Sequence, residues 1–134
     1  MAPIPAKILI VDDHRGVRKT LRALLARERH WRIYDVESGA VALALIREIR
    51  PHIALLDLVM PEMNGVELAI AIRQLENAPK IVLMSSHYTP EEAAVLARLF
   101  GDGNFVPKAE AGMLLVSTIN RLLPEECQAK GASA

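Results

Sequence analysis

The sequence predicts an α/β protein in which a parallel sheet lies between two layers of helices. Strand-like apolar runs alternate five times with amphipathic helical patterns along the 134 residues, which are enough for one domain with a core. Hydrophobic residues make up 51% of the chain and aromatic residues only 4%, so aliphatic side chains must build that core. The 16 basic and 16 acidic residues balance, which argues against a nucleic-acid or membrane-surface module.

The first two strand–helix pairs are expected between residues 7 and 49. Residues 7–11 form a β-branched apolar run that is typical of a buried strand. Residues 14–28 carry apolar side chains at helical spacing and therefore predict an amphipathic helix. Its solvated face is expected to carry Arg15, Arg18, Lys19 and Arg22. Residues 31–36 alternate like a half-exposed strand, and Ser38 is a suitable N-cap for a helix over 39–49.

The middle of the chain repeats this pattern twice more. Residues 53–57 are a short apolar run that ends in Asp57, as expected for a strand buried on both faces. A helix is predicted over 66–76 and a further buried strand over 80–84. The next helix starts at Thr89, where an N-cap, a proline and two acids follow one another, and runs to about Phe100.

The last pair is a short strand over 104–107 and a helix over 112–123. We expect a single domain over 1–134 whose core spans about 6–123, and a flexible tail over 124–134, because the residues from Pro124 on are small and polar. The single Cys127 excludes an intrachain disulfide and fits a reducing, cytoplasmic location. No apolar run reaches about 18 residues and no secretory signal is visible, so no membrane association is expected.

Polar groups follow four of the five predicted strands. They are Asp12 and Asp13 after the first, Asp57 at the third, Ser85 at the fourth and Lys108 after the fifth. Because the carboxyl ends of parallel strands meet at one edge of the sheet, these side chains are expected to lie together. Clustered carboxylates repel one another unless a cation joins them, and oxygen ligands suit Mg²⁺. Each residue alone could be a turn, a cap or a surface group, but together they could bring a phosphoryl group onto an aspartate.

With these residues in place, the chain resembles the receiver domain of two-component response regulators over about residues 6–123. The matching features are Val11-Asp12-Asp13, Leu56-Asp57, Met60-Pro61, Met63-Asn64-Gly65, Ser85 and Lys108. The resemblance implies a flavodoxin-like fold, a three-layer α/β/α sandwich with strand order 2-1-3-4-5. It also implies a phosphorylation-dependent signalling switch rather than a classical enzyme, with a sensor histidine kinase as its partner.

The resemblance further implies a role for each polar residue. Asp57 would accept the phosphoryl group, and Ser85 and Lys108 would contact the phosphoryl oxygens. Mg²⁺ would be held by the carboxylates of Asp12, Asp13 and Asp57 and by the backbone carbonyl of Val59. Ser85 and Phe105 would form the switch. It would alter the surface of the fourth helix, fifth strand and fifth helix, where a partner or a second copy of the chain would bind.

Two departures from the family pattern and two rival functions stand beside this interpretation. Ser85 occupies a position where the family often has Thr, and Ala109 follows Lys108 where the family commonly has a cis proline, so the isomer of that peptide is open. A hydrolase of the haloacid-dehalogenase type would need an acid two residues after Asp57, where Val59 stands. A receiver-like interaction module that works without phosphorylation is the remaining alternative. The motif Phe-Val-Pro-Lys-Ala at residues 105–109 resembles that of receivers that precede a helix-turn-helix domain. The chain could therefore be a stand-alone receiver or a piece of a longer protein.

Overall fold

The computed structural model describes residues 4–58, 60, 65–86, 89–101 and 104–128. A five-stranded parallel sheet has the order β2-β1-β3-β4-β5, which confirms the predicted order. The strands are β1 (Ala6–Val11), β2 (Trp31–Val36), β3 (Ile53–Asp57), β4 (Lys80–Ser85) and β5 (Phe105–Pro107). The strand order and the three layers together confirm the flavodoxin-like fold class.

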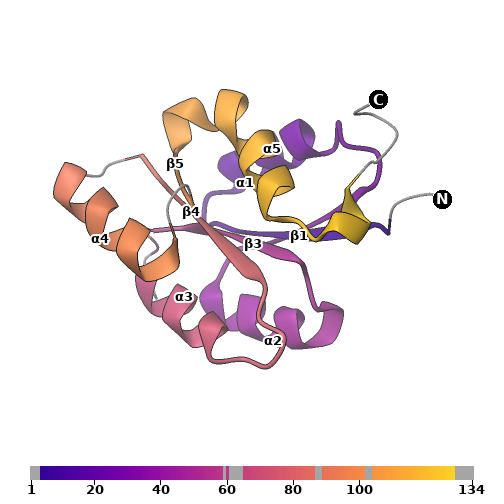
Figure 1. Cartoon of the computed structure of the whole chain (residues 1–134), viewed down its shortest axis with the longest axis horizontal. Helices are drawn as coiled ribbons and strands as arrows, with labels where there is room; N and C mark the ends of the chain where they lie inside the picture. The colour runs from indigo at the N-terminus through magenta and orange to yellow at the C-terminus, as the bar shows by residue number, and fades with distance from the viewer. Residues whose placement is uncertain (1–3, 59, 61–64, 87–88, 102–103, 129–134) are drawn as a thin grey trace.

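In the described part of the chain, five α-helices cover the two faces of the sheet (Figure 1). They are α1 (Arg15–Leu25), α2 (Gly39–Ile49), α3 (Gly65–Arg73), α4 (Pro90–Phe100) and α5 (Ala111–Leu122). Helices α1 and α5 pack on one face, and α2, α3 and α4 pack on the other, each face with its own hydrophobic cluster. None of the helices in the described ranges is long and apolar enough to cross a membrane.

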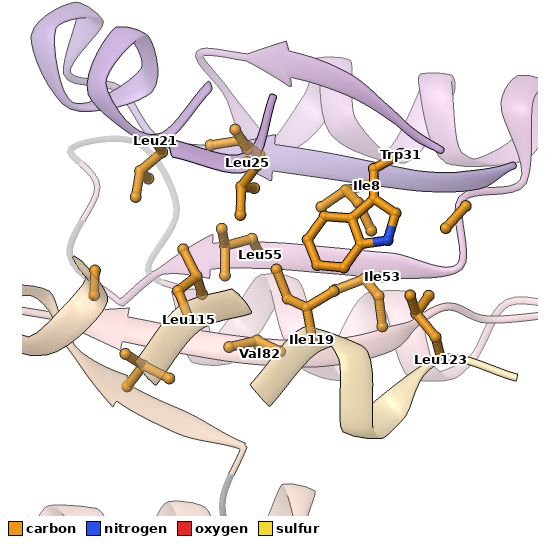
Figure 2. Close-up of a cluster of buried hydrophobic side chains, with 14 of the residues drawn as sticks. Ile8, Leu21, Leu25, Trp31, Ile53, Leu55, Val82, Leu115, Ile119 and Leu123 are labelled. Carbon is orange, nitrogen blue, oxygen red and sulfur yellow. The ribbon is translucent and has the colours of Figure 1, made fainter. Parts of the chain in front are cut away.

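The two faces follow from the period of two along each strand. Ile8 of β1 points into the cluster under α1 and α5 (Figure 2), and Ile10 belongs to the same cluster, while Leu9 and Val11 belong to the cluster on the opposite face. On β3 the residues Ile53 and Leu55 join the α1–α5 cluster. Asp57 is the next residue but one after Leu55 on β3, and Asp12 is the next but one after Ile10 on β1. Both carboxylates therefore begin on the face of the sheet that α1 and α5 cover.

The helix caps and several boundaries can be compared with the predictions. Ser38 Oγ accepts a hydrogen bond from the backbone N–H of Val41, and Thr89 forms a capping box with Glu92, so both predicted caps are confirmed. The predicted helix over 14–28 was too long, because α1 ends at Leu25. Residues 26–30 carry no large apolar side chain to bury, and they turn the chain into β2. The helix over 66–76 was also too long, since α3 ends at Arg73.

The C-terminal segment is ordered further than predicted. Residues Glu125–Cys127 form a short 3-10 helix, η2, and the side chain of Cys127 is fully buried in the cluster under α1 and α5. The backbone N–H of Ile4 donates to the carbonyl of Glu126 at 2.8 Å. The expectation of a flexible tail from residue 124 is therefore wrong for this part, and residues 129–134 lie outside the described ranges.

Candidate functional site

Three carboxylates meet at the carboxyl edge of the sheet. Strands β1 and β3 are neighbours with Val11 opposite Leu56, so Asp12 and Asp57 follow side by side. Oxygen atoms of Asp12, Asp13 and Asp57 all lie within 4.8 Å of one another. Asp12 and Asp57 are buried, at 2% and 7% exposure, while Asp13 is exposed. The structure thus brings together the three acids that the sequence analysis expected to meet.

A lysine ammonium lies between the two buried carboxylates. The Nζ atom of Lys108 is 3.0 Å from Oδ2 of Asp12 and 3.4 Å from Oδ2 of Asp57. Lys108 opens the 3-10 helix η1 (Lys108–Glu110) directly after β5, and the peptides of the described residues, including Lys108–Ala109, are all trans. Buried charges are costly unless they are paired, so this contact offsets part of the cost of burying the two carboxylates.

The backbone around Asp12 fixes its carboxylate. The N–H of Asp12 donates to the carbonyl of Val36 at 3.2 Å, which extends the pairing of β1 with β2 by one residue. The backbone N–H of His14 donates to Oδ1 of Asp12 at 2.8 Å. One carboxylate oxygen therefore accepts this backbone bond while the other faces Lys108, and the side chain is held in one orientation.

Gly65 holds the chain that leaves Asp57, a role that sequence reasoning missed. Its N–H donates to the carbonyl of Leu58 at 2.9 Å, and the N–H of Leu58 donates to the carbonyl of Met84 at 2.9 Å. A Cβ atom at position 65 would overlap the backbone carbonyl of Asp57 and would lie 2.6 Å from Cα of Leu58. Only glycine allows α3 to begin this close to β3. The sequence showed the glycine but not how closely the start of α3 approaches the end of β3.

Ser85 lies at the carboxyl end of β4, one residue beyond the position that pairs with Asp57. It is buried, at 1% exposure, and it lines a groove of about 400 Å³ between α3 and α4. Phe105 is half-buried and packs against the cluster on the α4 side of the sheet. Val59, whose carbonyl was expected to bind the metal, lies outside the described residues.

The arrangement has the chemistry of a divalent-metal and phosphoryl site. Carboxylate oxygens are the ligands that Mg²⁺ prefers, and Mg²⁺ is commonly bound through one or two carboxylates, waters and phosphate oxygens. The oxygens of the acidic group are close enough together to serve one ion. The residues therefore fit a magnesium ion, and Lys108 supplies a second positive charge beside Asp57.

The fold and the site together define a receiver. Residues 8–120 match the family model of the response regulator receiver domain, and this chain belongs to that family. Receiver domains bind Mg²⁺ at an acidic pocket, and the group of Asp12, Asp13 and Asp57 could hold the ion here. The match confirms the resemblance drawn from the sequence.

The chain is also similar to parts of longer curated proteins. It is 42% identical over 78 residues to the transcriptional regulatory protein YdfI of Bacillus subtilis, covering 58% of this chain and 37% of that protein. It is 34% identical over 108 residues to the protein-glutamate methylesterase/protein-glutamine glutaminase 5 of Myxococcus xanthus, covering 80% of this chain and 31% of that protein. The chain spans about half or less of the length of these curated relatives, and their names describe different outputs.

Solved structures agree with this assignment. The signal receiver domain of the response regulator NarL from Mycobacterium tuberculosis superposes with a TM-score of 0.77 at 29% identity. The match covers 87% of this chain and 94% of that one, so the two share the whole domain.

Proposed function

We propose that this chain is a phosphorylation-dependent signalling switch of a two-component system, and that Asp57 accepts the phosphoryl group from a sensor histidine kinase. The observation that carries the proposal is the buried carboxylate of Asp57 with Lys108 and the carboxylates of Asp12 and Asp13 around it. A structural ion pair would need one acid for one lysine. Among the described residues, one lysine faces this group of three acids, and a metal ion would add positive charge to the group.

In the proposed reaction, an oxygen of Asp57 attacks the phosphorus of a phosphohistidine on the kinase. The new P–O bond forms as the P–N bond breaks, and the imidazole leaves with the bonding electron pair. Bound Mg²⁺, held by Asp12, Asp13, Asp57 and the carbonyl of Val59, would neutralise charge on the phosphoryl oxygens. Lys108, already 3.4 Å from Asp57, would pair with a phosphoryl oxygen, and the hydroxyl of Ser85 would donate to another.

The signal would leave the site through Ser85 and Phe105. A phosphoryl group adds negative charge and acceptor oxygens, and it would draw Ser85 toward Asp57. Phe105 would then turn further into the space near α4, because its ring has no hydroxyl that must keep a polar partner. The surface formed by α4, β5 and α5 would change, and a partner or a second copy of this chain would bind there.

Exposed apolar side chains on α4 and α5 support the proposal of a partner-binding surface. Met113 on α5 is 83% exposed. Val95 and Leu99 on α4 are 46% and 44% exposed and line the groove toward α3 that also holds Ser85. Side chains of this kind gain free energy when a partner covers them.

A beryllofluoride titration followed by NMR tests the switch, since beryllofluoride with Mg²⁺ imitates an aspartyl phosphate. The proposal predicts Mg²⁺-dependent shifts at Asp57 and Ser85 together with a changed environment of the Phe105 ring. Shifts at Asp57 and Ser85 with an unchanged Phe105 would refute this route for the signal. Absence of any Mg²⁺-dependent shift would favour the receiver-like interaction module that works without phosphorylation.

A further inference from the structure

Arg18 of α1 reaches back to the turn that carries two of the three acids. Its Nη1 atom donates to the backbone carbonyl of Asp12 at 2.8 Å, and its Nε atom lies 3.5 Å from Oδ1 of Asp35 on β2. The Arg18 side chain is only 14% exposed. The expectation that all the cations of α1 form a solvated face is therefore wrong for Arg18, whose guanidinium packs between β2 and the β1–α1 turn.

The carbonyl that Arg18 binds belongs to the peptide between the two acids. The C=O of Asp12 and the N–H of Asp13 share one rigid plane, so holding that carbonyl fixes the direction in which the chain enters Asp13. Asp12 has further supports, because its N–H, its Oδ1 and its Oδ2 are each bound. For the carboxylate of Asp13, the described part of the chain offers no hydrogen bond or ion pair, so its position depends on the backbone alone.

We propose that Arg18, anchored by Asp35, is a positioning residue that orients the Asp12–Asp13 peptide and thereby presents Asp13 to the metal ion. The inference rests on the proposed Mg²⁺ site and extends it to a residue that does not touch the ion. The effect comes from geometry rather than from net charge. The guanidinium is paired with Asp35, a carboxylate that Arg22 shares, and this pairing reduces its field at the acidic group.

Arginine suits this role because two of its nitrogens serve two acceptors at once. Nε faces the Asp35 carboxylate while Nη1 faces the Asp12 carbonyl, in directions fixed by the planar guanidinium. A lysine at position 18 would keep the charge but would place a single nitrogen between two acceptors. Lysine therefore separates the two explanations, since it preserves any effect of charge and loses the orientation of the peptide.

The chain offers a matched control on the same helix. Arg22 also binds Asp35, with its Nη1 atom 3.0 Å from Oδ2, but among the described residues it donates no hydrogen bond to the β1–α1 turn. Replacing Arg22 thus removes a similar ion pair and a similar charge without releasing the Asp12 carbonyl.

The experiment measures Mg²⁺ affinity by calorimetric titration of the full chain for the wild type, Arg18→Ala, Arg18→Lys and Arg22→Ala. Substitutions that support a metal ligand from the second layer typically weaken binding by about tenfold or more. We expect losses of about tenfold in Arg18→Ala and Arg18→Lys and an unchanged affinity in Arg22→Ala. Phosphorylation of both Arg18 variants by acetyl phosphate should recover at saturating Mg²⁺, which general unfolding would not allow. Thermal melts without Mg²⁺ check that each variant is folded.

The possible failures are distinguishable. Wild-type affinity in Arg18→Lys would show that charge and not orientation acts, and it would overturn the proposal. An equal loss in Arg22→Ala would overturn it as well, because the Asp35 pairing and not the Asp12 carbonyl would then be responsible. If the wild type itself binds no Mg²⁺, the proposed metal site fails, and the positioning role fails with it.

Discussion

Replacing Lys108 by Met is the perturbation whose outcome follows most directly from the geometry of the site. Methionine has a similar length but no charge, so the substitution leaves the carboxylates of Asp12 and Asp57 without the ammonium that lies 3.0 and 3.4 Å away. Both carboxylates are buried, and neither can regain full hydration. The variant should therefore be less stable than the wild type when no metal is present.

The size of this loss can be worked out from the burial of the groups. Removing one partner of a buried ion pair costs about 3–5 kcal/mol. Lys108 is 20% exposed, which places the loss near the lower end, at about 3 kcal/mol. For a domain of this size, about 1 kcal/mol changes the melting temperature by roughly 3–4 °C, so we expect a fall of about 10 °C. A ligand at a hundred times its Kd stabilises the folded state by about 2.7 kcal/mol, so Mg²⁺ at that concentration should recover most of the stability that Lys108→Met loses.

The assay is a thermal melt with and without Mg²⁺. Lys80→Met serves as the control, because Lys80 is exposed and makes no ion pair in the described ranges. Mg²⁺ should raise the melting temperature of Lys108→Met more than that of the wild type, since the lysine no longer competes for the carboxylates. A metal-free Lys108→Met protein as stable as the wild type would refute the reasoning. It would mean that the carboxylates do not depend on the ammonium.

Three further predictions concern other parts of the fold. Gly65→Ala should lower the free energy of unfolding by about 1–3 kcal/mol, because the added methyl group overlaps backbone atoms. The control Gly16→Ala places its methyl group in open space and should be neutral or stabilising, and urea unfolding of the two variants tests the difference. Burial, and then the charge of Lys7, lower the pKa of His52. As the pH falls, His52 is therefore protonated in the unfolded chain before it is protonated in the folded one, and the free energy of unfolding should decrease below about pH 6.5. His52→Asn should flatten this fall between pH 7.5 and 5.5, and an unchanged slope would contradict the assignment. Burial raises the pKa of the Cys127 thiol, so a thiol reagent should react far more slowly with the folded than with the unfolded chain. Rapid labelling of the folded chain would mean that η2 does not keep Cys127 buried.

The sheet and the acidic group could be predicted because local sequence patterns determine them. The run of apolar residues ending in Asp57 marks a strand buried on both faces, and parallel strands bring Asp12 and Asp57 to one edge. The alternation of strands and helices determines the layers without any knowledge of side-chain contacts.

The features that escaped prediction all depend on contacts between residues far apart in sequence. Cys127 is buried because η2 docks beside the N-terminal strand, and its polar neighbours gave no sign of this. Gly65 matters because the backbone of Asp57 occupies the space that a Cβ atom at this position would need. Arg18 looked like the other cations of α1, and only the position of Asp35 on the neighbouring strand turns it toward Asp12.

The central claim, that Asp57 accepts a phosphoryl group with the help of Mg²⁺, is tested most directly by intact-mass measurement after incubation with acetyl phosphate. The wild type and the control Glu67→Gln, which removes an exposed acid at the start of α3, should each gain one phosphoryl group only when Mg²⁺ is present. Asp57→Asn should gain none, because the amide cannot act as the nucleophile. Undiminished labelling of Asp57→Asn, or labelling of the wild type that does not depend on Mg²⁺, would contradict the assignment of the site.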